Sequence, residues 1–159
     1  SFVPKPFTPF QWVSQAPMDD LREKQEYLKN LLKMKNVTYN WHTPEVSFME
    51  AVFARGDRRL GDVLLKAWEN GCKFDGWTEQ FRFDEWMKAF ESCKLDPSFY
   101  ALRERKTDEI FPWDHIDIGV TKHFLLREYE KALRGEVTPD CRTGCAGCGV
   151  TSLGKGVCG

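Results

Sequence analysis

The sequence predicts a mainly α-helical protein: a compact bundle of short helices with one or two short extended segments and a cysteine-rich C-terminal tail. Apolar residues recur at three- and four-residue steps through most of the chain's middle. Helix-start signals such as Thr43-Pro44-Glu45 and helix-stop glycines divide these stretches. Four of the six cysteines lie after residue 140, among Gly, Thr and Ser. We therefore expect an extended Pro/aromatic segment at 1–17, a helical domain at 18–135 and a tail at 136–159.

The helical elements follow one another closely. The first is expected over residues 18–34, because acidic residues begin it and lysines end it, as the helix dipole favours. The second runs from Pro44 to Gly56, and the third lies between Asp57 and Gly71, with Leu64 and Trp68 among its inward residues. Further helices are expected over 83–93, briefly from Asp96, and over 121–134.

Three segments are expected to be extended. Prolines at 4, 6, 9 and 17 exclude a helix or a central strand at the N-terminus. Residues 37–42 alternate apolar and polar side chains, as a half-buried strand does, and residues 111–116 are the third such segment.

Composition limits the class of protein. The chain has 159 residues, 42% of them hydrophobic, which suits one domain or one domain with an appendage. A net charge of −1 argues against a whole-surface nucleic-acid binder. No apolar run can cross a bilayer and no signal-peptide pattern is present, so we expect a cytoplasmic protein with no membrane partner.

The C-terminal cysteines form the strongest chemical signal. Cys141, Cys145 and Cys148 are separated by three and two residues, and Cys158 can loop back as a fourth ligand. Such spacing suits zinc or an iron–sulfur cluster, and nothing between the cysteines decides the metal. The tail has too few apolar side chains to bury enough surface to order itself, so we expect metal binding to supply the ordering free energy. The alternative is a flexible tail with free or disulfide-bonded thiols.

Two other groups of side chains have a functional and a structural interpretation. Arg58 and Arg59 lie in the first turn of a helix, where cations oppose the dipole. They can bind a phosphate or an acidic partner, or they can be solvated or paired with Asp57 or Asp62. Aromatic residues interleaved with basic residues over 73–88 can stack with nucleic-acid bases, although their helical spacing favours a place in the core.

The catalytic motifs that sequence alone can identify are missing. The chain has no phosphate-binding loop, nucleophile elbow or His-Glu-x-x-His motif, so no catalytic residue is assigned.

The chain resembles one known family in several motifs. The stretch Ser1-Phe-Val-Pro-Lys5-Pro-Phe-Thr8-Pro9-Phe-Gln-Trp12 looks like the end of a radical S-adenosylmethionine barrel. The remainder resembles the region after the barrel in cobalamin-binding-type radical S-adenosylmethionine proteins. The motifs that carry this match are Val37-Thr-Tyr-Asn-Trp-His42, Ala54-Arg-Gly-Asp-Arg-Arg-Leu-Gly61, Gly71-Cys-Lys-Phe-Asp-Gly-Trp77, Pro112-Trp-Asp-His115, Thr138-Pro-Asp-Cys-Arg142 and the terminal cysteines.

The resemblance implies a parent enzyme that cleaves S-adenosylmethionine with a 4Fe–4S cluster and carries cobalamin in another domain. Its catalytic cluster motif would precede residue 1, and only Lys5 and Thr8 would lie toward the S-adenosylmethionine end. The first interpretation is a C-terminal accessory module, inactive alone, whose partners are the missing barrel and N-terminal domains and whose cysteines hold zinc or an auxiliary 4Fe–4S cluster. The second is a zinc-binding interaction module that docks RNA, a ribosome-associated protein or another protein partner through Arg58 and Arg59.

Overall fold

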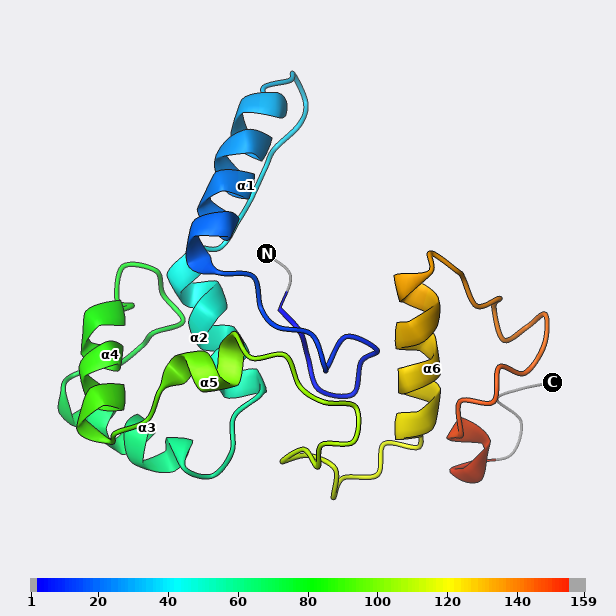
Figure 1. Ribbon diagram of the computed structural model, residues 1–159. Coiled ribbons are helices and arrows are strands. Elements are labelled where there is room, and N and C mark those ends of the chain that lie inside the picture. The colour runs from blue at the N-terminus through cyan, green and yellow to red at the C-terminus, as the bar shows by residue number, and fades with distance from the viewer. Residues whose placement is uncertain (1–2, 155–159) are drawn as a thin grey trace. The chain divides into compact units, whose positions relative to one another are not determined.

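The chain is mainly helical, as the sequence predicts. The computed structural model describes residues 3–154, and within that range it contains six α-helices, one short 3-10 helix and no β-strand. The elements in order are α1 (Met18–Leu31), α2 (Pro44–Ala54), α3 (Leu60–Glu69), α4 (Phe83–Ser92), α5 (Pro97–Ala101), α6 (Lys122–Leu133) and η1 (Val150–Ser152) (Figure 1). In the described part of the chain, no helix combines the length and the apolar character that a bilayer crossing needs.

Expected side-chain caps mark where α2, α5 and α6 begin. The hydroxyls of Thr43 and Thr121 accept from the N–H groups of Val46 and Phe124, and the carboxylate of Asp96 accepts from the N–H of Ser98. Each bond satisfies an N–H that the helix itself cannot pair. Gly71 and Gly135 have φ angles of +88° and +70°, which release the chain from α3 and α6.

The packing divides the chain into two compact units. Unit 1 comprises residues 1–3 and 14–103, and unit 2 comprises residues 4–13 and 104–159. The boundaries differ from the expected 1–17, 18–135 and 136–159, because residues 4–13 pack with α6 and its flanking segments. The packing of residues 4–13 with α6 could not be predicted from sequence proximity, because about a hundred residues separate the two segments.

The core of unit 1 is formed by α2, α3, α4 and α5. Fully buried side chains include Val52, Val63, Phe90 and Ala101, and Val3 packs with them. Arg55 is also fully buried, and its guanidinium donates to the carbonyl oxygens of Ala101 and Arg103 at 3.1 and 2.9 Å. Leu64 and Trp68 were expected to face inward, but they are 48% and 59% exposed. The buried stripe of α3 instead follows Leu60, Val63 and Ala67, at three- and four-residue steps.

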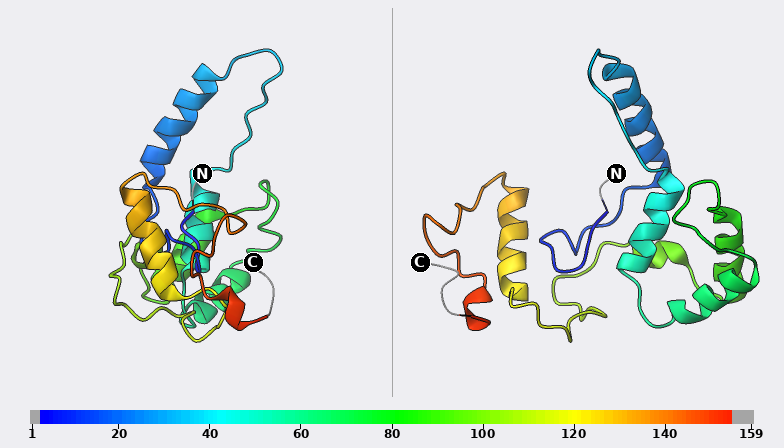
Figure 2. Two further views of the ribbon diagram at one scale, coloured as in Figure 1. Left: turned by 90° about the vertical axis from the view of Figure 1, so that its right-hand side faces the viewer. Right: turned by 180° about the vertical axis from the view of Figure 1, so that it is seen from behind.

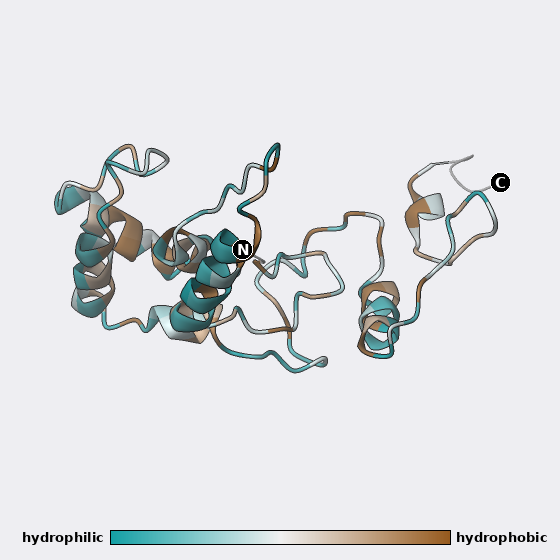
Figure 3. Ribbon diagram, turned by 90° about the horizontal axis from the view of Figure 1, so that it is seen from above, coloured by the Kyte–Doolittle hydropathy of each residue, from teal (hydrophilic) through white to brown (hydrophobic). Residues whose placement is uncertain are grey.

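The core of unit 2 is an aromatic cluster on one side of α6. Trp12, Phe111, Trp113 and Leu125 are buried together, and Tyr129 lies 5.8 Å from Trp12 between ring centroids. Gln11 is also buried, and its Oε1 accepts from the Trp113 indole N–H at 3.0 Å. Seen along its axis in Figure 3, α6 carries both hydrophobic and hydrophilic residues, as an amphipathic helix does. Ala132 and Leu133, expected to face inward, are both exposed at the end of this helix, Leu133 by 69%.

The three segments expected to be extended contain no strand in the described residues. Residues 6–13 form turns closed by backbone bonds from Gln11 to Thr8 and from Val13 to Phe10, as prolines at 6 and 9 favour. Residues 111–116 also turn, because the carboxylate of Asp114 accepts from the N–H of Phe111. Residues 37–42 run without a partner strand beside α1.

Candidate functional site

The cysteine-rich tail lies along α6. The N–H of Thr121, at the start of the helix, donates to the carbonyl oxygen of Cys148 at 2.9 Å. Further along, Arg127 donates to the carbonyl oxygen of Ala146. Lys131 then donates to the hydroxyl of Thr138 at 2.8 Å. The tail therefore runs antiparallel to the helix from residue 138 to residue 148.

These contacts attach the tail to the helix although the tail has few apolar side chains to bury. Polar bonds to α6 hold it, together with close backbone approaches at Gly119 and Gly149. A methyl group added at Gly149 would lie 2.8 Å from the carbonyl oxygen of Gly119, so that contact needs glycine. Burial contributes little, because Leu153 is 63% exposed and Val137 is 89% exposed. The described part of the tail is therefore held by polar contacts rather than by a hydrophobic core, as its composition predicts.

Three of the four expected ligand thiols can be located. Cys141 and Cys145 are exposed, Cys148 is half-buried, and all three are free thiols. Cys158 lies outside the described residues. Across residues 3–154, no three Cys, His or carboxylate side chains converge on a common point. A metal would therefore have to draw the thiols together as it binds.

The Cys145–Cys148 turn already has one feature of a thiolate site. The N–H of Gly147 points at Sγ of Cys145 at 3.4 Å. Gly147 has a φ of +68°, a conformation that glycine adopts without steric cost and that turns the chain back on itself. An amide N–H directed at sulfur complements the negative charge of a ligating thiolate.

A cavity of about 300 Å³ lies between this loop and α6. Its wall includes Cys145 together with Arg127, Lys131 and Thr138. The cations are already engaged within unit 2: Lys131 pairs with Glu128 at 3.3 Å, and Arg127 holds Ala146. The hydrogen bond from Thr138 and the nearby charge of Lys131 hold the pKa of Glu128 below its ordinary value. These side chains fasten the loop to the helix rather than leaving a free anion site.

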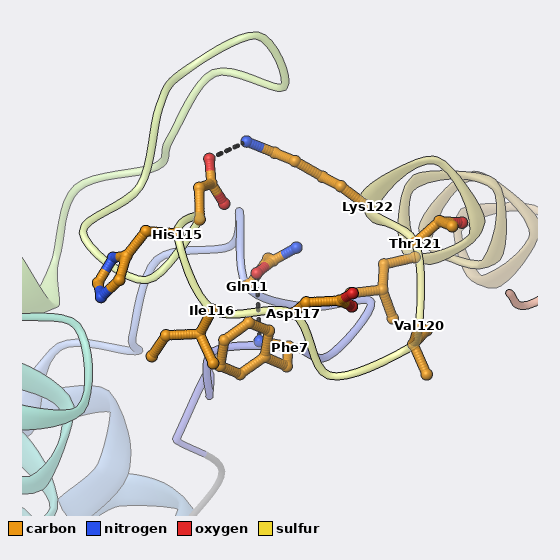
Figure 4. A pocket seen from close by; sticks show the side chains of 10 residues that line it. Phe7, Gln11, His115, Ile116, Asp117, Val120, Thr121 and Lys122 are labelled. Carbon is orange, nitrogen blue, oxygen red and sulfur yellow. Dashed lines mark hydrogen bonds and ion pairs between the residues drawn. The ribbon is translucent and has the colours of Figure 1, made fainter. Parts of the chain in front are cut away.

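A second cavity of unit 2, about 490 Å³, lies at the start of α6 (Figure 4). Phe7, Ile116 and Val120 contribute apolar side chains to its wall, and Gln11, His115 and Asp117 contribute polar ones. Lys122 and Asp114 form an ion pair at 2.7 Å on its edge. That pair, the exposed His115 and the exposed Asp117 do not make a nucleophile with an adjacent base.

Lys5 and Thr8, which the resemblance placed toward the S-adenosylmethionine end, share one turn of unit 2. The hydroxyl of Thr8 donates to the carbonyl oxygen of Lys5 at 2.8 Å, and the Lys5 side chain is exposed. The bond explains how the local sequence turns between two prolines. A role for either residue toward a cofactor stays a prediction.

Of the two arginines considered for partner binding, Arg59 is engaged within unit 1. It forms an ion pair with Asp57 at 2.7 Å, and its guanidinium lies 5.7 Å from the ring centroids of Phe99 and Tyr100. Its hydrogen bonds hold the pKa of Asp57 below its ordinary value. The expected alternative, a pair with Asp57, is confirmed for Arg59, while Arg58 is exposed.

The aromatic residues over 73–88 separate into two groups. Trp86 is buried and Phe81 and Phe83 pack against the core, as their helical spacing favours. Phe74 and Trp77 are instead 75% and 65% exposed. A further aromatic pair was missed: the half-buried Tyr39 and the exposed Trp41 stack on each other, although their alternation in the sequence predicted a strand.

Searches of protein-family models, curated proteins and solved structures found nothing that matches this chain. Any function is therefore inferred from the chain's own residues and contacts.

Proposed function

We propose that the C-terminal part of unit 2 binds a metal through Cys141, Cys145 and Cys148, with Cys158 as the fourth thiolate. In the same proposal, the chain is a C-terminal accessory module of a radical S-adenosylmethionine enzyme and is catalytically inactive alone. The observation that carries the metal site is the Gly147 N–H directed at Sγ of Cys145, on a loop already fastened to α6.

The donor set agrees with this chemistry. Thiolates are the preferred ligands of both structural zinc and iron–sulfur clusters, and two ligands separated by two residues are common in both. The three described thiols lie within eight consecutive residues, from Cys141 to Cys148. Because Cys141 and Cys145 are exposed, the metal would reach them without opening a core. When bound, the metal would supply cross-linking of the loop.

The accessory role has a different basis. It follows from the resemblance of the motifs at 1–12, 37–42, 54–61, 71–77, 112–115 and 138–142 to radical S-adenosylmethionine proteins. S-adenosylmethionine and cobalamin belong only to the parent enzyme in this proposal. We do not place a partner surface at Arg58 and Arg59, because Arg59 is held by Asp57.

Anaerobic purification of the full chain, followed by elemental analysis and a visible absorption spectrum, tests the metal site. We expect either about one zinc per chain and no visible band, or iron with sulfide and broad visible absorption. The double variant Cys145→Ala/Cys148→Ala should lose the metal. Cys93→Ala, which removes a thiol from unit 1, should keep it. Neither zinc nor iron in the reduced, oxygen-free protein would overturn the proposal.

A further inference from the structure

One surface of unit 1 is an arm made of α1 and the loop that returns beside it (Figures 1 and 2). We define the end of α1 and the loop that returns beside it, residues 27–42, as the arm tip. The loop is attached near the base of the arm, where the side-chain amide of Gln25 donates to the carbonyl oxygen of His42 at 2.9 Å. The arm tip contains no part of the cysteine-rich tail, so a ligand bound there would not depend on the proposed metal.

Charge is distributed unevenly along the arm. Its base carries the acids Asp19 and Glu45, both of which pair with Arg22. The tip contains three lysines, Lys29, Lys33 and Lys35, and no acidic residue. Lys29 pairs with Glu26 at 2.6 Å, whereas Lys33 and Lys35 are exposed and bonded at most to a neutral amide. The tip is therefore a local cationic surface on a chain of net charge −1.

The tip also presents aromatic rings in a stacked arrangement. The ring centroids of Tyr39 and Trp41 are 5.1 Å apart with their planes 21° from parallel. Lys29 places its ammonium 4.5 Å from the centroid of the Trp41 ring. Trp41 is nevertheless 44% exposed, and Tyr27 on α1 is 66% exposed. A planar ligand that displaces the Lys29 ammonium from the ring can stack on Trp41, next to cations that attract the ligand's negative charge.

Neutral hydrogen-bonding side chains alternate with these rings. Asn36, Thr38 and Asn40 are exposed between Val37, Tyr39 and Trp41. Amide and hydroxyl groups can form hydrogen bonds with base edges, and this feature favours a nucleic-acid ligand over a lipid surface. Leu31 and Met34, 58% and 56% exposed, offer apolar contact beside the rings.

From the charge, the ring stack and the neutral side chains together, we propose that the arm tip binds single-stranded nucleic acid. The lysines would contact phosphates, Trp41 and Tyr39 would stack with unpaired bases, and the asparagines would contact base edges. A duplex keeps its bases stacked on each other and cannot use the rings in this way.

The other exposed aromatic group of unit 1 makes an informative comparison. Trp68, Phe74 and Trp77 are 59%, 75% and 65% exposed, so they present even more aromatic surface. The acids Glu69, Asp75 and Glu79 lie among them, however, and only Lys73 opposes those charges over 69–79. Phosphate repulsion disfavours nucleic acid there, which makes Trp77 a matched control for Trp41.

Fluorescence anisotropy of labelled 12-nucleotide oligouridylate and oligothymidylate, titrated with the full chain at low and high salt, tests the proposal. We expect binding that weakens steeply with salt. Trp41→Ala should weaken it about tenfold, and Lys33→Gln/Lys35→Gln should reduce the logarithmic salt slope by about 1.4, because each phosphate contact to a single strand contributes about 0.7. Trp77→Ala should bind like the native chain. Circular dichroism of each variant checks that the helices are retained.

Further measurements identify the ligand or overturn the proposal. Tighter binding of the RNA oligomer assigns a contact to the 2′-hydroxyl, and equal affinity assigns the shared base and phosphate chemistry. No oligonucleotide binding at low salt would overturn the proposal, as would equal losses in Trp41→Ala and Trp77→Ala. A labelled 12-base-pair duplex that binds as tightly as the single strands would exclude stacking. Binding only to phosphatidylserine vesicles would assign the tip to a lipid surface instead.

Discussion

The N–H of Thr121 donates to the carbonyl oxygen of Cys148 at 2.9 Å. Thr121 is also the capping residue of α6, since its hydroxyl accepts from the N–H of Phe124. The same residue therefore begins the helix and fixes the end of the cysteine loop, so a change that disturbs the loop end is expected to register at the helix start.

Gly149→Ala tests this connection. Gly149 has a φ of +105°, and an added methyl group would lie 2.8 Å from both the Gly119 carbonyl oxygen and the Thr121 methyl carbon. We expect a loss of about 1–3 kcal/mol in the local stability of the loop end, seen as faster hydrogen exchange at the Thr121 amide. Gly135→Ala carries similar backbone strain at φ +70° but meets no neighbour within 4 Å. Unchanged exchange at Thr121 in Gly149→Ala would contradict this contact.

Arg127→Ala should release the middle of the loop. Its guanidinium donates to the Ala146 carbonyl and lies 5.1 Å from the ring centroid of Phe124. Limited proteolysis should then cut faster between residues 141 and 149, while the helical circular dichroism stays nearly constant. The control is Arg134→Ala, because Arg134 pairs only with the exposed Glu136 in the described contacts. Equal cleavage of the two variants would show that Arg127 does not hold the loop.

Docking of Thr138 on α6 should depend on pH through Glu128. The Thr138 hydroxyl and Lys131 lower the pKa of Glu128 below its ordinary value of 4.5. Because the pKa is depressed in the folded state, the stabilisation is complete above pH 4.5 and is lost as the pH falls through the folded pKa. NMR shifts of Thr138 should report this loss below pH 4.5, and Glu128→Gln should abolish it. Glu130→Gln, on an exposed position of the same helix, should preserve it.

Gln11→Ala should weaken unit 2 specifically. The side-chain Oε1 of Gln11 accepts from both the Trp113 indole N–H and the backbone N–H of Phe7. Removing the amide leaves a buried donor unpaired, at a cost of about 1–3 kcal/mol. Denaturation followed at the Trp113 indole proton should shift, whereas signals from α2 and α4 should not. Gln80→Ala, at an exposed position of unit 1, should leave both unchanged.

Local capping signals in the sequence predicted the starts of α2, α5 and α6, whereas Asp57 was expected to cap α3 and does not, because α3 begins after Arg59 without a side-chain cap. Thr43, Asp96 and Thr121 cap the helices that they were expected to begin, and Gly71 and Gly135 leave α3 and α6 with positive φ. These signals act within four residues, so the sequence contains all of the information that they need.

The predictions that were wrong depend on residues distant in the chain, or on an alternating pattern that can form something other than a strand. Alternation at Val37, Tyr39 and Trp41 predicted a strand. The rings of Tyr39 and Trp41 instead stack on each other, and this stacking needs no hydrogen bonds to a neighbouring strand. The turn at 111–116 could have been predicted from Pro112 and Asp114, whose side chain bonds to the local backbone.

The candidate metal site shows the same division. Its thiols and their spacing are evident in the sequence, and whether they hold a metal stays a prediction. The attachment of the loop to Thr121 and Arg127 joins residues 19 to 27 positions apart, which spacing alone cannot predict.

The make-up of unit 2 has a consequence for biosynthesis. Trp12 and Gln11 belong to a core whose other members, Phe111, Trp113 and Leu125, are made about a hundred residues later. At a translation rate of roughly 5–20 residues per second, the early aromatic segment waits about 5–20 seconds on the ribosome before its partners emerge. During that interval these two side chains are available to chaperones.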